Sequence, residues 1–187
     1  MKKIEKRVGY KLFEMNKKGE LFPLFIDKNT VQPMNKWIKA EYHPTKGFAP
    51  RGGWHLGADV PDAPWLKSYD GTETGYYKPR WKAGKRVWCE VEYNANHDYN
   101  KDVSILPKKC FTDKVPEDGY YFFREVGKGV WIITSDVKIT KILTEEERQD
   151  IMCKKAYSEA EAFAKYNETF KKKIANKKAK TRKESRK

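Results

Sequence analysis

Residues 87–93 read Val87-Trp88-Cys89-Glu90-Val91-Glu92-Tyr93. The positions 87, 89, 91 and 93 are apolar, and the two glutamates fall between them. Successive side chains of a β-strand point to opposite faces, so this alternation predicts a strand with one buried and one solvated face.

Further stretches of the chain are also typical of strands. Residues 8–26 predict a hairpin, because two apolar runs flank the turn residues Asn16-Lys17-Lys18-Gly19. Residues 35–42, residues 119–124, and residues 130–134 continuing to 137–143 predict more strands. We therefore expect an α+β fold whose body, residues 1–143, is a mixed or antiparallel sheet with room for one or two short helices.

A long amphipathic helix is predicted after the body, over residues 144–170. Thr144-Glu145-Glu146-Glu147 has the pattern of a capping box, with the threonine as N-cap and Glu147 three residues on. Apolar residues then recur every three or four positions, interrupted by one polar residue: Met152, Ala156, Ala160, Phe163, Asn167, Phe170 and Ile174. A helix of this length either projects into solvent or packs on a partner.

The positive charge is concentrated at the end of the chain. The 187 residues carry a net charge of +14, and residues 171–187 contribute +9 of it, with ten Lys or Arg and one acid. Because residues 171–187 contain few apolar side chains, burial cannot offset the conformational entropy lost when the segment is ordered. We therefore expect a flexible basic tail or a frayed helix. Such a tail either binds nucleic acid without sequence preference or serves only for solvation.

A second basic segment lies at residues 76–88, where aromatic and basic residues are interleaved. Such a segment could bind DNA or RNA, with its aromatic rings stacked on bases and its basic side chains paired with phosphates. The alternative is a basic loop that leads into a strand, which has the same composition. The candidate nucleic-acid residues are Lys78, Arg80, Lys82, Lys85 and Arg86.

The composition excludes several classes of protein. No run approaches the ~18 apolar residues of a membrane span, so we expect no membrane partner. The charged start leads into no apolar signal region, and the three cysteines, Cys89, Cys110 and Cys153, have no CxxC spacing. These features favour a cytoplasmic protein. The three histidines lack metal-ligand spacing, so we expect no metal site.

The most distinctive stretch for chemistry is Arg51-Gly52-Gly53-Trp54-His55-Leu56-Gly57-Ala58-Asp59. Paired glycines allow a close approach of the backbone to a ligand or a strand. A planar heterocycle could stack on Trp54 while His55 bonds a ribose hydroxyl. The alternative is a turn with a buried tryptophan and a histidine satisfied by the backbone. Glu90 and Glu92, on one strand face, are either an acid–base pair or a solvated sheet face.

This stretch resembles the signature of small, mostly uncharacterised proteins encoded by bacteriophages and mobile elements of gut bacteria. Their motif commonly has Pro where this chain has Gly52, and the resemblance covers roughly residues 8–146. It implies an accessory protein in the cytoplasm of an infected bacterial cell, with a host protein as a partner or with packaging in a virion.

The same stretch is also similar to an element of the ADP-ribosyltransferase superfamily that lines the nicotinamide pocket. That resemblance implies an ADP-ribosyltransferase-like fold that binds NAD or another nucleotide through Gly53, Trp54, His55 and Tyr10. His55 would occupy the ring-binding position. The superfamily places a catalytic Glu ahead of the last aliphatic run, where this chain has Gly129-Val130 and where Glu125 is the nearest acid.

Two functions are therefore expected. One is an enzyme-like NAD or nucleotide pocket with His55 and Glu125 as catalytic candidates. The other is a noncatalytic nucleic-acid-binding or virion-associated protein that uses residues 76–88 and the basic tail.

Overall fold

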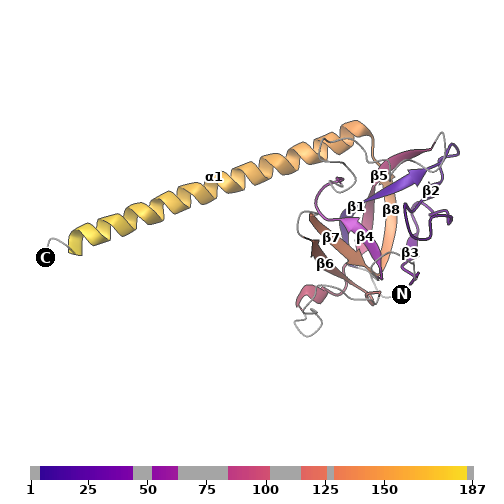
Figure 1. Ribbon diagram of the computed structural model, residues 1–187, viewed down its shortest axis with the longest axis horizontal. Helices are drawn as coiled ribbons and strands as arrows, with labels where there is room; N and C mark the ends of the chain where they lie inside the picture. The colour runs from indigo at the N-terminus through magenta and orange to yellow at the C-terminus, as the bar shows by residue number, and fades with distance from the viewer. Residues whose placement is uncertain (1–4, 44–51, 63–83, 102–114, 126–128, 185–187) are drawn as a thin grey trace. The chain divides into compact units, whose positions relative to one another are not determined.

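The computed structural model describes residues 5–43, 52–62, 84–101, 115–125 and 129–184 (Figure 1). The chain divides into two compact units, Met1–Arg148 and Gln149–Lys187. The first unit holds an eight-stranded antiparallel sheet, and the second belongs to one long C-terminal helix. The α+β class and the antiparallel sheet agree with the prediction.

The strands follow the order β3-β8-β5-β1-β4-β7-β6 across the sheet, with β2 paired to β1 beside this path. Their bounds are β1 Lys6–Met15, β2 Leu21–Phe22, β3 Trp37–Lys39, β4 Trp54–Gly57, β5 Lys85–Asn94, β6 Tyr120–Glu125, β7 Gly129–Thr134 and β8 Asp136–Ile142. Among the described residues before Thr144, the 3-10 helix η3, Tyr99–Lys101, is the only helical element, where one or two short helices were expected.

The longest strand pair is β1 with β5, which stay in register over ten residues from Lys6 opposite Asn94 to Met15 opposite Lys85. The predicted alternation in β5 is confirmed, because its apolar residues 87, 89, 91 and 93 are buried while Glu90 and Glu92 are partly exposed. The predicted hairpin is confirmed as well, since β2 pairs with the end of β1.

One residue, Ser135, joins β7 to β8, although β4, β1 and β5 separate these two strands in the sheet. The sheet must therefore curl until its two sides meet at this corner. Ser135 donates its amide to the Gly119 carbonyl and accepts the Ala40 amide, at 3.0 and 2.6 Å. The sequence pattern predicted one continuing strand over residues 130–143, and the structure divides it at this point.

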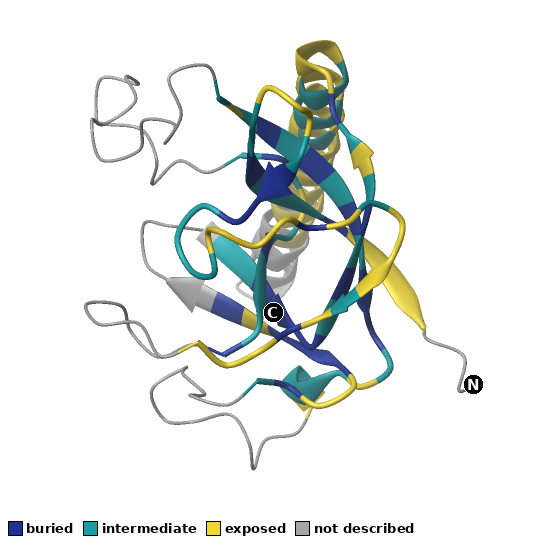
Figure 2. Cartoon of the chain, turned by 90° about the vertical axis from the view of Figure 1, so that its right-hand side faces the viewer, coloured by how far each residue is buried: buried dark blue, intermediate teal, exposed yellow. Residues whose placement is uncertain are grey.

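The curled sheet encloses the main hydrophobic core. Figure 2 colours the buried stretches of the strands dark blue. Seven of the eight strands contribute buried residues to this core, and the partly buried Ile38 of β3 packs against it, so the strands bury one face against strands distant in sequence. Apolar area of this kind is worth roughly 25 cal/mol per Å² removed from water. Its buried members are Phe13, Leu21, Leu56, Val87, Cys89, Val91, Tyr93, Ala95, Tyr120, Ile132, Val137 and Ile139.

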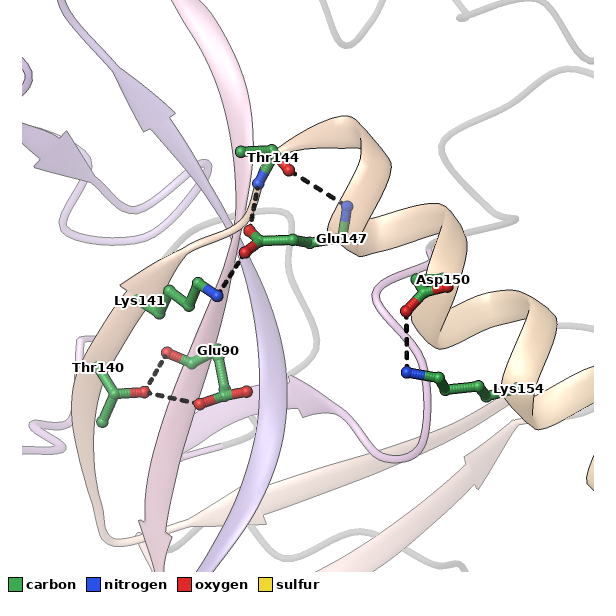
Figure 3. Close-up of polar contacts among 7 residues, drawn as sticks. All are labelled: Glu90, Thr140, Lys141, Thr144, Glu147, Asp150 and Lys154. Atoms are coloured by element: carbon green, nitrogen blue, oxygen red, sulfur yellow. Dashed lines mark hydrogen bonds and ion pairs between the residues drawn. The ribbon is translucent and has the colours of Figure 1, made fainter.

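The helix α1 spans Glu145–Glu184 and begins at the predicted capping box (Figure 3). The Thr144 hydroxyl accepts the Glu147 amide at 3.2 Å, and the Glu147 carboxylate accepts the Thr144 amide at 3.0 Å. Lys141 of β8 pairs with the same carboxylate, which ties the first turn to the sheet. The helix continues beyond residue 170, so residues 171–184 of the expected tail are helical.

Within the described residues, no helix is both long enough and apolar enough to cross a membrane.

Candidate functional site

The strand β4 carries the predicted pair Trp54 and His55, and it directs their side chains to opposite faces of the sheet. Trp54 faces the interior and packs against the main core. Its indole nitrogen donates to the Ile38 carbonyl at 3.0 Å. The structure therefore does not bring the indole and the imidazole together on one face, as a single stacking pocket would require.

Lys11 lies on the interior face beside Trp54. Its ammonium is 5.2 Å from the centre of the indole ring and 5.7 Å from that of Phe13, which are cation–π distances. It donates to the His55 carbonyl at 2.9 Å. Burial lowers the pKa of Lys11 to about 8, although the nearby Cys89 thiol opposes this shift. One face of Trp54 is thus already in contact with a cation of the protein itself.

Cys89 lies directly opposite Lys11 on β5 and is fully buried. Burial raises the pKa of the thiol to about 12, against a smaller opposing effect of Lys11. The thiol is therefore neutral at physiological pH and is no nucleophile. The cluster of Lys11, Trp54 and Cys89 was not predicted. The signal that could have predicted this cluster is the position of Lys11, which is two residues before the buried Phe13 and therefore lies on the same face of the strand.

On the other face, His55 is accompanied by Tyr10, which lies opposite Gly57 in the β1–β4 pair. Opposed residues of an antiparallel pair share a face, as do residues two apart in a strand, so Tyr10 and His55 are on the same side. Both side chains are half-buried. Burial, with a contribution from Glu90, raises the pKa of the Tyr10 hydroxyl.

The turn after β4 folds back over Gly57. A Cβ on Gly57 would lie 3.0 Å from the Val60 carbonyl oxygen, so the absence of a side chain allows this approach. The guanidinium of Arg148 holds the turn by donating to the Pro61 carbonyl at 2.9 Å and by pairing with Asp62 at 3.5 Å. The sheet surface beside Tyr10 is therefore partly covered by the chain's own turn.

Gly53 precedes β4 with a φ of +123°, which L side chains rarely adopt. A Cβ there would lie 2.7 Å from Cγ2 of Ile133 on β7. This glycine therefore allows β4 to pack closely against β7, which accounts for it without a ligand.

Glu125, the other catalytic candidate, is the last residue of β6 and lies opposite Gly129 of β7. His55 lies opposite Ile133 of the same strand, four residues further along. The two backbone positions are thus offset by about 13 Å along the strands and by two strand spacings, about 10 Å, across them. The structure does not bring these candidates together.

The basic candidates of residues 76–88 are distributed differently. Lys85 is exposed at the start of β5. Arg86 is partly buried and lies opposite the buried Glu14 of β1, so its charge faces an acid of the body. The candidates Lys78, Arg80 and Lys82 lie outside the described residues.

The acidic pair on β5 is engaged by neighbouring strands. Glu92 pairs with Lys6 at 2.6 Å and with Lys138 at 3.2 Å, and the hydrogen bond from Lys6 is the main cause that lowers the pKa of Glu92. The Thr140 hydroxyl contacts Glu90 (Figure 3). These contacts are typical of a cross-strand polar face. The described part of the chain contains no group of three or more His, Cys, Asp or Glu residues that could hold a metal ion.

No family model, curated protein or solved structure matches this chain. The resemblances to phage-encoded proteins and to ADP-ribosyltransferases therefore stay predictions from the sequence.

Proposed function

We propose that this chain is a noncatalytic nucleic-acid-binding protein that uses the basic C-terminal end of α1. The observation that carries the proposal is that residues 171–184, with eight Lys or Arg and one acid, are helical. The described side chains at this end, Lys171 to Lys173, are exposed.

The charge density of this end suits a polyphosphate. Fourteen helical residues span about 21 Å at ~1.5 Å per residue. A DNA duplex carries one negative charge per ~1.7 Å, so the same length offers about 12 phosphates. Basic residues and phosphates are thus present in comparable numbers, and counterion release supplies the binding free energy without sequence preference.

The body supports a noncatalytic role. The two catalytic candidates, His55 and Glu125, lie on strands that are not neighbours. Trp54 packs inward, and the Cys89 thiol is buried and protonated. Acid–base or nucleophilic catalysis needs groups within hydrogen-bond reach of one reacting atom.

The test compares the salt dependence of DNA and RNA binding by the full chain and by a variant with Lys171, Lys172, Lys173 and Lys177 changed to glutamine. If these four contact phosphates, the slope of log affinity against log salt falls by about 3.6. The control changes Lys154, Lys155 and Lys165, which precede the basic end of the helix, to glutamine, and it is expected to retain the slope. An unchanged slope in the first variant would refute binding by the basic end.

A nucleotide pocket is the second candidate, because Tyr10 and His55 share a face and are half-buried. If that face binds NAD, His55→Ala abolishes binding and leaves the melting temperature nearly unchanged. If His55 is structural, the same change costs ~1–3 kcal/mol. Calorimetric titration of the wild type and the variant with NAD decides this, and a wild type that releases no heat with NAD excludes the pocket.

A further inference from the structure

The second unit exposes aromatic side chains along the helix. Phe163, Tyr166 and Phe170 are 67%, 65% and 52% exposed, and we call them the aromatic stripe. Their spacings of three and four residues place them on one face of α1. The rings of Tyr166 and Phe170 are stacked, with their centres 6.2 Å apart. Large rings are rarely left in water on one contiguous helix face without a partner.

The charges along α1 indicate how a second copy would be oriented on the stripe. Residues 149–166 contain three acids and three bases, a net charge of 0, whereas residues 167–184 contain eight bases and two acids, a net charge of +6. A parallel pair of helices would set the two strongly basic ends side by side. An antiparallel pair sets each basic end against the neutral half of the other helix, which avoids this repulsion and so favours the antiparallel orientation.

The position of the stripe fits the same arrangement. A two-fold axis between residues 166 and 167 would place residue 149 opposite residue 184 of the partner, so the helix from Gln149 to Glu184 would overlap its copy along its full length. It would also place Phe163 opposite the partner's Phe170. The aromatic stripe is therefore at the centre of the pair, where an interface is driest.

We propose that the aromatic stripe of α1 binds the aromatic stripe of a second copy of this chain, with the two helices antiparallel. The exposed rings alone would bury about 700 Å² over both copies, taking ~150–250 Å² for a whole aromatic side chain. Methylene stems of neighbouring lysines add to this area. The total lies at the low end for specific interfaces, so we expect a dimer that dissociates in the micromolar range.

The first experiment measures the oligomeric state of the full chain by sedimentation, after nuclease treatment so that no nucleic acid bridges two copies. The wild type is expected to be a dimer, and Phe163→Glu to weaken it at least about tenfold. Tyr157→Glu is the matched control. Tyr157 is even more exposed, at 76%, but lies six residues before Phe163, about 240° around the helix, and so outside the stripe.

Glutamate is a good helix former, and far-UV circular dichroism verifies that the variant helices persist. Phe170→Gln is a second stripe variant, which removes the ring without adding a charge and is expected to weaken the dimer as well. A wild type that stays monomeric at tens of micromolar leaves the stripe to a different partner and overturns the proposal. A Phe163→Glu chain that dimerises like the wild type overturns it too.

The second experiment tests the orientation with a spin label on Cys153, which is exposed on α1. Cys110 is first changed to serine, and Cys89 is buried. An antiparallel pair places the two labels about 40 Å apart along the helices, from ~1.5 Å per residue. A parallel pair would place them within about 20 Å, since helices pack 8–10 Å apart. A short distance would contradict the proposed orientation.

Discussion

Lys11 gives the sharpest test of how the interior of the sheet is organised. Its ammonium lies among Trp54, Phe13 and Cys89 on the buried face, and its pKa is lowered to about 8 from 10.5. At ~1.36 kcal/mol per pKa unit, the difference corresponds to about 3 kcal/mol against the charged form in the folded state. The perturbation is Lys11→Met, which retains an unbranched side chain, one atom shorter, and removes the charge.

The expected pH dependence follows from the protons bound in each state. Below pH 8 the lysine is charged both folded and unfolded, so the full cost of burying the charge is present. Between about pH 8 and 10.5 the folded state has lost this proton and the unfolded state retains it. The free energy of unfolding contributed by Lys11 therefore rises with pH across this window, by at most about 3 kcal/mol.

The assay is urea unfolding of the wild type and Lys11→Met at several values between pH 7 and 10.5. Only the difference between the two proteins is interpreted, because burial also raises the pKa of Cys89 and of Tyr120 to about 12, and both groups destabilise the fold at high pH. We expect the wild type to gain stability relative to the variant as pH rises.

Lys17→Met is the control, since Lys17 is exposed in the turn after β1 and water solvates its ammonium in both states. Its difference from the wild type should not change with pH. A Lys11→Met difference that is equally flat from pH 7 to 10.5 would refute the placement of a buried charge beside Trp54.

Three further outcomes are expected. Gly53→Ala should lower the free energy of unfolding by about 1–3 kcal/mol, through strain at positive φ and an overlap with β7. Gly19→Ala is also at positive φ but has open space around it, so it should lower the free energy of unfolding by less. Thermal denaturation of both variants checks this. Thr144→Ala should cost about 1 kcal/mol through the lost cap, and an unchanged urea midpoint would contradict the capping box. In the native chain a thiol reagent should modify Cys153 quickly and Cys89 only after unfolding, as peptide mass spectrometry would detect.

The pattern of neighbouring residues in the sequence was sufficient to predict three features: the strand β5, the start of α1 and the hairpin of β1 and β2. The strand β5 shows its buried face by alternation, and the start of α1 shows itself through the reciprocal hydrogen bonds of Thr144 and Glu147. The hairpin of β1 and β2 was equally predictable, because the turn chemistry lies between its two strands. In each case the signal that predicts the element lies in residues close together in the sequence.

The candidate site was less predictable because it depends on strand neighbours. The residues Trp54 and His55 are adjacent in the sequence, and only the strand conformation of β4 separates their side chains to two faces. The sequence does not indicate that β4 lies between β1 and β7, which brings Lys11 to the indole and separates His55 from Glu125. The corner at Ser135 is similar, since one residue between two apolar runs has no local signal of a change of direction.

The separation of core and charge between the two units makes the proposals independently testable. Every buried residue of the main core precedes residue 140, whereas residues 149–187, with thirteen bases and five acids, carry +8 of the net +14. Substitutions of exposed residues in α1 therefore remove no core contact, and they should change nucleic-acid affinity or dimerisation at an unchanged melting temperature of the body. Substitutions at Lys11 or Gly53 should do the reverse. A variant of the basic end that loses affinity and also destabilises the body would show that the two units are energetically coupled, and its lost affinity would then be no measure of phosphate contacts.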